Sequence, residues 1–297
     1  MQTILSEEFT SRMYVPRHDM HIHTCYCNHT DEDATFENYI NFATEMGMLY
    51  LGFAEHVWDQ ESAALIDLIR QDVETMEMPE GAPKILVGAE VDADPCQSDG
   101  RPLAGELTVE LDYVVLAAHH GLRLGQPRGE SIQVGKLTEA EREYYGDSFL
   151  DWYQACIESG NYDIMAHLLR SAVTGGLISF SDRKTFARVA EMLSLAAARG
   201  MVLELNCGWN FYLMKHGCFE PFIELMQDGK ANGLKFCISS DAHAMDHFWT
   251  TDLESKDQVT TNLSPIKFIE AAGLEETDWL DPAVFLDRRA REVEKPK

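Results

Sequence analysis

Two short segments each place a pair of metal-binding side chains on one face of an extended chain. Because side chains alternate along a strand, His21 and His23 would point to the same side, where both imidazoles can reach one metal ion, with Asp19 in line as a hydrogen-bond acceptor behind them. Near the other end of the chain, Asp241 and His243 form a second same-face pair of a carboxylate and an imidazole. Two such pairs predict a metal site if their segments become neighbours.

Other apolar segments end in the same kinds of residue. Glu90 closes an apolar run, where a lone buried carboxylate is costly unless it is paired or bound to a cation, and a position bridging two cations would remove that cost. His119 and His167 each follow an apolar run, and each taken alone is more typical of a core histidine than of a metal ligand. His56 ends another segment, and His29 lies in the loop after the first one. Their shared placement predicts one common site.

The remaining candidates are assigned to other roles. Glu55 should face opposite His56, which favours a structural ion pair. Cys25 and Cys27 form a C-x-C pair that could supply thiolates to zinc, but no second cysteine pair completes a four-ligand cage, so we interpret both as ordinary loop cysteines. Four further histidines are interpreted as surface residues or supporting neighbours of the site: His18, His120, His216 and His247.

The elements that must position these residues are strands alternating with helices. Seven short segments rich in β-branched and apolar residues predict buried strands: 18–23, 49–56, 85–92, 113–120, 162–167, 202–207 and 235–243. Helical periodicity follows most of them, at 36–46, 148–159, 182–199, 220–227 and 265–272, with a glycine at or just after each end. Alternation of this kind favours parallel pairing, and seven units predict an α/β fold, a distorted (β/α)7 barrel in which the strand ends meet on one face.

Residues 1–297 are expected to form one domain with two long polar loops, 93–111 and 121–147, over the barrel mouth. Within residues 121–138 of the second loop, Arg123, Arg128 and Lys136 stand against Glu130 alone, which is as consistent with binding an anion as with a solvated loop of chance composition. The segment after Gly273 predicts a surface helix with a frayed end.

The ordered set of strand-end residues resembles the polymerase and histidinol phosphatase (PHP) family over nearly the whole chain. The residues that carry the resemblance are His21, His23, His29, His56, Glu90, His119, His167, Asp241 and His243. The resemblance implies a distorted (β/α)7 barrel with three divalent metal ions, either Zn, Mn or Fe. It implies that His21, His23, Glu90 and Asp241 hold one ion, that Glu90 bridges to a second ion on His119 and His167, and that His29, His56 and His243 hold the third.

The chemistry implied is hydrolysis of a phosphate ester by a hydroxide that bridges two cations. Asp241 is the expected acceptor of the proton from the attacking water, and His243 or the third ion would assist the leaving alkoxide. A cationic side chain would neutralise the phosphate oxygens, for which we favour Arg170, with Arg123 or Arg128 as loop alternatives. A surface ion pair explains Arg170 equally well.

The segments 111–115 and 239–243 resemble the histidinol-phosphate phosphatase branch, which makes L-histidinol phosphate the expected substrate among small-molecule phosphomonoesters. A phosphatase or cyclic phosphodiesterase acting on nucleotides or sugars is a close alternative. An amidohydrolase-type C–N hydrolase also uses H-x-H and a terminal Asp, but does not require His29, His56 and His243. A non-catalytic or exonuclease-like replication module is a third class, which the acidity of the chain disfavours.

Composition limits the partners. The 297 residues carry 24 Lys and Arg against 50 Asp and Glu, a formal charge of -26 that repels nucleic acids and anionic membranes. We therefore expect neither as a partner. Met1 to Arg17 contain no apolar core of signal-peptide length, no stretch approaches a membrane span, and seven cysteines form no dense disulfide framework, so we expect a cytoplasmic protein. The sequence leaves the oligomeric state open.

Overall fold

Seven parallel strands pair in chain order in the computed structural model, which describes residues 17–126, 130–249 and 264–286. All seven predicted strands are present, several of them shorter than predicted. They are β1 (His18–Ile22), β2 (Tyr50–Val57), β3 (Lys84–Asp92), β4 (Val114–Ala117), β5 (Ile164–Met165), β6 (Val202–Asn206) and β7 (Lys235–Ser239).

The sheet curves until its first and last strands meet. Just beyond β7, Asp241 N donates to His21 O at 2.9 Å, and His23 N donates to Ala242 O at 3.0 Å. A parallel bridge joins Ile22 to Ala242. The predicted (β/α)7 architecture is therefore confirmed as a nearly closed barrel, and its closure brings the two metal-type pairs of the sequence side by side.

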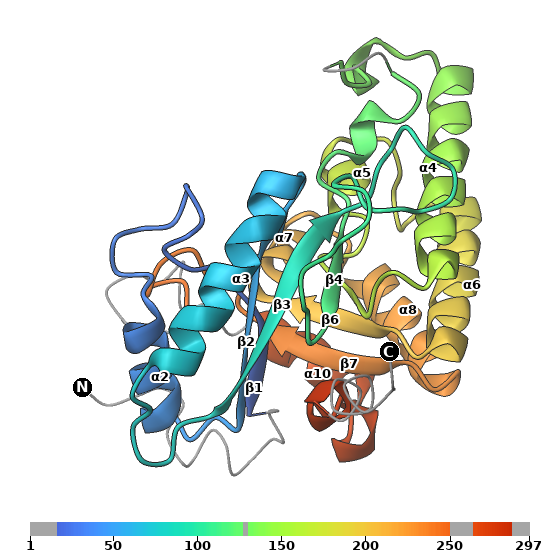
Figure 1. Ribbon diagram of the computed structural model, residues 1–297. Coiled ribbons are helices and arrows are strands. Elements are labelled where there is room, and N and C mark those ends of the chain that lie inside the picture. The colour runs from blue at the N-terminus through green and yellow to red at the C-terminus, as the bar shows by residue number, and fades with distance from the viewer. Residues whose placement is uncertain (1–16, 127–129, 250–263, 287–297) are drawn as a thin grey trace.

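Helices cover the outside of the barrel, with α2 and α3 beside the first strands and α4, α6 and α8 along the side of the last ones (Figure 1). The helices are α2 (Phe36–Glu45), α3 (Gln60–Thr75), α4 (Glu139–Ser159), α5 (Arg170–Thr174), α6 (Arg183–Arg199), α7 (Cys207–Lys215), α8 (Phe219–Ala231) and α10 (Ser264–Ala272). Short 3-10 turns are η1 (Gly121–Arg123), η2 (Val134–Lys136) and η3 (Glu276–Asp278). The surface helix predicted after Gly273 is not continuous in the described residues, because the segment up to residue 286 begins with the 3-10 turn η3; residues 287–297 lie outside the described residues.

Two predicted helix boundaries are wrong. The helix predicted from 148 begins at Glu139, so the long loop ends at 138 and not at 147. The reason is a capping box, in which the Thr138 side chain accepts from Glu141 N while Glu141 accepts from Thr138 N. The break predicted at Gly229 is absent because α8 continues through it; Gly229 permits close packing, since a Cβ there would lie 2.8 Å from Leu234 Cδ2.

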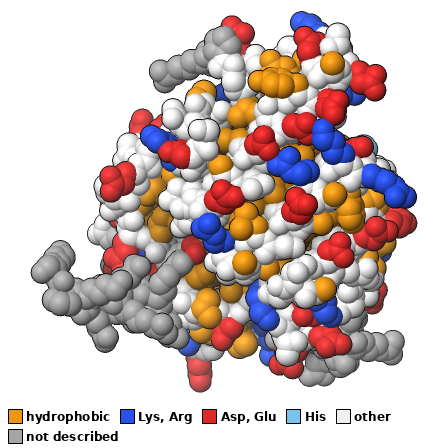
Figure 2. Space-filling model, turned by 90° about the vertical axis from the view of Figure 1, so that its right-hand side faces the viewer, with side chains coloured by type: hydrophobic (Ala, Val, Ile, Leu, Met, Phe, Trp, Pro, Cys, Tyr) orange, Lys and Arg blue, Asp and Glu red, His pale blue; other side chains and the backbone are white. Residues whose placement is uncertain are grey.

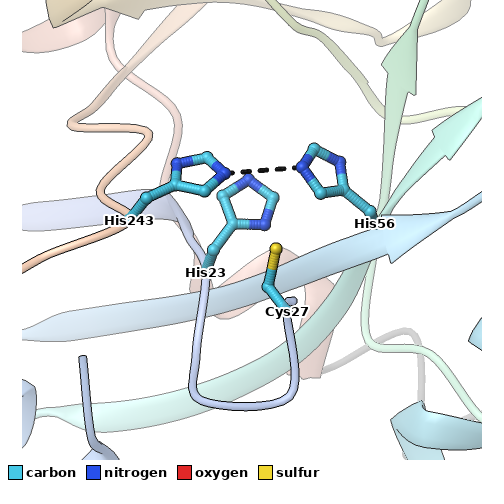
Figure 3. A group of neighbouring side chains, drawn as sticks. All are labelled: His23, Cys27, His56 and His243. Carbon is cyan, nitrogen blue, oxygen red and sulfur yellow. Dashed lines mark hydrogen bonds between the residues drawn. The ribbon is translucent and has the colours of Figure 1, made fainter. Parts of the chain in front are cut away.

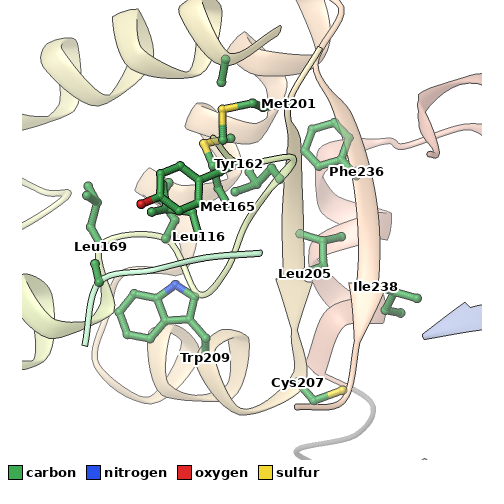
Figure 4. Packing of buried hydrophobic residues seen from close by; sticks show 14 of the residues in the cluster. Leu116, Tyr162, Met165, Leu169, Met201, Leu205, Cys207, Trp209, Phe236 and Ile238 are labelled. Carbon is green, nitrogen blue, oxygen red and sulfur yellow. The ribbon is translucent and has the colours of Figure 1, made fainter. Parts of the chain in front are cut away.

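The hydrophobic core has an outer and an inner part. The outer part lies between strands and helices, where Met165 and Leu205 pack with Trp209 (Figure 4). The inner part fills the barrel below the strand ends, around Tyr113, whose hydroxyl donates to Met20 O at 2.9 Å. Glycines at 52 and 88 leave room for this ring, because a Cβ at either would clash with it. Because apolar side chains fill the interior of the barrel, the polar side chains of the site lie at the strand ends.

The outer face over α4 and α6 carries charges of both signs among hydrophobic side chains (Figure 2). Lys184 of α6 contacts Glu143 and Asp147 of α4, each at 2.8 Å. These pairs are exposed, so they contribute little to stability. Within the described residues, no helix combines the length and apolar character needed to cross a membrane.

Candidate metal centre

The two histidines at the end of β1 share one orientation. His21 Nδ1 lies 2.7 Å from Glu204 Oε1 of β6, and His23 Nδ1 lies 3.0 Å from Glu55 Oε1 of β2. Each carboxylate accepts the Nδ1 proton, which leaves Nε2 of each ring as the free donor atom. The two Nε2 atoms are 3.2 Å apart, and Asp241 Oδ1 lies 3.3 Å from His23 Nε2.

Glu90, 1% exposed at the end of β3, lies at the centre of the site. Its Oε1 is 2.9 Å from His167 Nε2 and 3.3 Å from His119 Nε2. Its Oε2 is 2.6 Å from His56 Nδ1 and 3.5 Å from His21 Nε2. The two carboxylate oxygens thus face different groups of imidazoles, as a bridging ligand requires.

Asp92 supports the histidines after β4. Its Oδ1 accepts from His119 N at 3.0 Å, and its Oδ2 lies 3.2 Å from His119 Nδ1 and 3.3 Å from His120 Nδ1. The His119 ring therefore turns Nε2 toward Glu90, in the same way that Glu204 and Glu55 orient the β1 histidines.

A third group gathers next to His23. His56 Nε2 lies 3.4 Å from His243 Nε2, and Cys27 points toward the same place (Figure 3). One ligand atom from each of His23, Cys27, His56 and His243 lies within 4.8 Å of the others. The His29 ring lies beside His56, at 5.3 Å between centroids, and its Nδ1 is 3.3 Å from Cys27 Sγ.

The carboxylates make this region attractive to cations. Burial opposes protonation of His21, but Glu90 and Glu204 outweigh it and raise its pKa well above the usual value. Burial likewise opposes ionisation of Glu90, yet the surrounding imidazoles lower its pKa well below the usual value. His21 and His23 have the same effect on the pKa of Asp241, which is lowered well below its usual value although the group is buried. A buried anionic cluster of this kind favours protons or metal ions between its members.

The pKa values of His56 and His243 are shifted in the opposite direction to that of His21. Burial, followed by the charge of His23, lowers the pKa of His243 to about 4, and burial also lowers the pKa of His56. Both rings are therefore neutral near pH 7, the form in which imidazole binds metal.

Two site residues have a left-handed backbone, with φ of 27° at His167 and 56° at Asp241. Each lies two residues beyond the end of a strand, and both β5 and β7 end earlier than the sequence pattern predicts. Such conformations are costly outside glycine and cluster at functional sites, and Asp is one of the residues that tolerates them best.

A cavity of about 540 Å³ opens above these residues. Arg170, half-exposed at the start of α5, lines it with Nη1 3.9 Å from Asp241 Oδ2. Arg123 is exposed on η1 and is not among the residues that line the cavity. Arg128 lies outside the described residues. The substrate-binding role of all three arginines stays a prediction.

The arrangement fits divalent cations. Two Nε2 atoms that face each other at 3.2 Å need a proton or a metal ion between them. Among the described residues, buried His56 Nδ1 and Glu90 Oε2 have no partner with hydrogen-bond geometry, although the two atoms lie close together. Unsatisfied buried polar atoms of this kind are expected where a metal ion completes the set.

Sequence reasoning missed several supporting residues. Glu204 and Asp92 are buried carboxylates in apolar strands, the same signal that identified Glu90, and it could have identified them. Asp19 does not support the imidazoles as predicted: it accepts from the backbone N–H of His21 and Ser240 and from Trp249 Nε1, and so ties β1 to the end of β7. The position of Cys27 among the histidines was also missed.

A family comparison decides the assignment. Residues 19–208, more than half of the chain, match the model of the PHP domain. The chain belongs to the PHP domain family. This confirms the family that the histidine pattern predicted, and the PHP match contains every proposed ligand except Asp241 and His243, which follow it in the sequence. No curated protein matches the chain.

Solved structures share the PHP fold. The histidinol phosphate phosphatase HisK of Lactococcus lactis subsp. lactis Il1403, complexed with zinc, L-histidinol and phosphate, matches with a TM-score of 0.58 at 16% identity over 87% of this chain and 94% of its own. A candidate histidinol phosphatase from Listeria monocytogenes matches with a TM-score of 0.51 at 16% identity over 78% and 97%. At this identity the likeness concerns the fold. Family membership and the donor set of the site together indicate a metal-dependent phosphoesterase.

Proposed function

We propose that the protein hydrolyses a small phosphomonoester, with L-histidinol phosphate as the first candidate substrate. The observation that carries the proposal is Glu90, buried among imidazoles from four other segments, at the base of a cavity with a cationic rim. The ligands in the Lactococcus lactis structure, zinc, L-histidinol and phosphate, support the choice of substrate.

The cavity suits a small ligand. Its volume of about 540 Å³ lies in the range of small-molecule sites. Trp58, stacked near His29 with ring centroids 6.2 Å apart, offers a flat apolar wall for a ring-bearing substrate, and Arg170 offers a positive charge for the phosphoryl group. Ser171 and Thr174 of α5 also line the cavity.

We propose three ions, with zinc as the first candidate. When bound, such ions lower the pKa of a water molecule and neutralise phosphate oxygens. Asp241 is ionised near pH 7 because its pKa is lowered, so its carboxylate can accept the proton of the attacking water. His243 would assist the leaving alkoxide by helping to hold the third ion beside it, since Asp241 O at 3.0 Å fixes the Nδ1 side of its ring. Arg170 would neutralise the charge that develops on the phosphoryl oxygens.

The two long segments are proposed to flank the mouth of the barrel within one domain of residues 1–297. Supporting this, Cys96 of the first and Leu124 of the second line a common cavity of about 600 Å³ with Tyr144 and Trp152 of α4. The second segment also begins directly after His120, which lines the cavity of the metal centre.

The test is a panel of phosphorylated amino alcohols, nucleotides, cyclic diesters, sugar phosphates and amides, measured with zinc- and manganese-loaded protein. We expect the highest kcat/KM for L-histidinol phosphate. A preference for nucleotides or cyclic diesters would replace the proposed substrate while keeping the enzyme class. Release of amines from amides with flat rates on every phosphate ester would contradict the proposed function itself.

Arg170 provides a residue-level test. Loss of a charge-assisted hydrogen bond costs about 1.5–3 kcal/mol, so Arg170→Ala should raise KM by roughly 10-fold or more. Arg183→Ala, which removes an exposed arginine from the start of α6, is the matched control and should leave KM unchanged. Equal KM values for the two variants would remove Arg170 from the substrate site.

A further inference from the structure

Cys27 lies in a fixed turn beside the histidines of the metal centre. Its N–H donates to Thr24 O at 2.9 Å, and its carbonyl accepts from Thr30 Oγ1 at 2.9 Å. The residue is 7% exposed, and its sulfur points toward His23 and His56 (Figure 3). The turn therefore holds the thiol in the site without further rearrangement.

Two distances within this group of side chains are close to those of co-ligands. With Zn–N of about 2.0–2.1 Å and Zn–S of about 2.3 Å, two ligands of a tetrahedral zinc ion lie ~3.3 Å apart for two nitrogens and ~3.6 Å apart for nitrogen and sulfur. His56 Nε2 and His243 Nε2 are 3.4 Å apart, and His29 Nδ1 and Cys27 Sγ are 3.3 Å apart.

An independent observation points to a cation at this place. The carbonyl of Asp241 can only accept a hydrogen bond, so His243 Nδ1 carries the proton and its Nε2 is a bare lone pair facing His56. Next to His56, Glu90 Oε2 has no partner with hydrogen-bond geometry among the described residues, although Glu90 is only 1% exposed. One proton on the His56 ring cannot serve both His243 Nε2 and Glu90 Oε2, so a further positive charge is needed between these groups.

We propose that the Cys27 thiolate is a fourth ligand of the ion held by His29, His56 and His243. His23 belongs to the same group of neighbours, but its Nε2 also faces His21 and Asp241, so it is assigned to the first ion. The inference rests on the proposed metal-dependent function and deepens it. One site has three nitrogens and a sulfur, whereas the others have nitrogen and oxygen. A thiolate favours zinc over manganese at that position, so the three sites differ in metal preference.

The experiment uses cobalt(II), a spectroscopic substitute for zinc, loaded into full-length protein stripped of metal. A thiolate bound to cobalt gives a charge-transfer band in the near ultraviolet, which nitrogen and oxygen ligands do not give. We expect this band in the wild-type protein and in Cys25→Ser, a matched control for an exposed cysteine two residues away. Cys27→Ser should lose the band. It should still bind cobalt at this site, but with an affinity reduced roughly 10-fold or more relative to the wild-type protein.

A second measurement avoids dependence on the variant. X-ray absorption at the zinc edge of the zinc-loaded wild-type protein should show a sulfur neighbour at about 2.3 Å, averaged over the bound ions. Its absence, or a charge-transfer band that persists in folded Cys27→Ser, would overturn the thiolate assignment while leaving the phosphoesterase function intact. Failure of the wild-type protein to bind cobalt or zinc at all would instead overturn both proposals.

Discussion

His18 and His21 lie three residues apart on β1 and are equally inaccessible, yet their surroundings act on them in opposite directions. Burial lowers the pKa of His18 to about 3, because the described residues place no carboxylate against its ring. His21 is also buried, but Glu90 and Glu204 raise its pKa well above the usual value. His18 Nε2 accepts a long hydrogen bond from Ile238 N at 3.4 Å, whereas His21 Nδ1 contacts Glu204 at 2.7 Å.

The difference separates a structural histidine from a ligand on the same strand. Burial by itself expels a proton from imidazole, so a buried histidine is not evidence of a cation site. A carboxylate at Nδ1 reverses the effect and also aims Nε2, which is the arrangement found at histidines that bind metals. The strand end is therefore built for cations, and the lower part of the barrel is built for packing around Tyr113.

The largest expected effect is at the strand end. Asp241→Asn should lower turnover by about 10³-fold or more, because an amide cannot accept the proton of the attacking water. Asn also tolerates the left-handed backbone at this position, where φ is 56°, so the fold should be retained. Phosphate release and metal content are measured on the same sample. Near-normal turnover at normal metal content would defeat the assigned role.

The next effect concerns the carboxylate behind His21. Glu204→Gln keeps the shape of the side chain but removes its charge, and should weaken metal binding by roughly 10–100-fold. Glu55→Gln, behind His23, should act in the same direction. Competition with a chelator measures both affinities, with exposed Glu45→Gln as control. Unchanged affinity in both variants would show that these carboxylates do not distinguish the β1 ligands from His18.

A smaller effect is expected at His18. His18 in the unfolded chain is protonated below about pH 6.5, whereas in the native protein its ring stays neutral down to about pH 3. The native protein is therefore not destabilised by His18 above pH 6.5, and it loses stability as the pH falls below that value. At pH 5 the loss is roughly 2 kcal/mol. His18→Gln should remove this slope, measured as the difference between denaturation curves of variant and wild type from pH 7 to 5. Exposed His247→Gln should leave the slope unchanged, and equal slopes in all three proteins would contradict the comparison.

The smallest effect is at the packed interior. Tyr113→Phe removes one buried hydrogen bond to Met20 O and should cost about 1 kcal/mol of unfolding free energy. Metal affinity should not change, because the ring still fills the barrel below the site. A loss of metal binding comparable to that of Glu204→Gln would show that the interior and the strand end are not separate in function.

Much of the fold was predictable because local pattern and barrel geometry agree. Apolar runs such as Val114–Ala117 favour buried strands, and glycines at 160 and 200 end their helices in the left-handed conformation, as predicted. The start of α4 was missed because Thr138 and Glu141, a capping box, lie in a polar stretch that otherwise reads as loop. Gly229 misled for the opposite reason, since its role is contact with Leu234 and not the end of a helix.

The sequence by itself determined which residue types end the strands, and the alternation of side chains was enough to put His21 and His23 on one face. Only the tertiary structure decided which carboxylate stands behind which imidazole, that Asp19 holds backbone and not a ring, and that Cys27 joins the histidines. The physical reason is the separation along the chain of the residues that each feature depends on. Side-chain direction along a strand follows from local stereochemistry, whereas a contact such as His21 with Glu204, 183 residues apart, exists only because closure of the barrel brings the strands together.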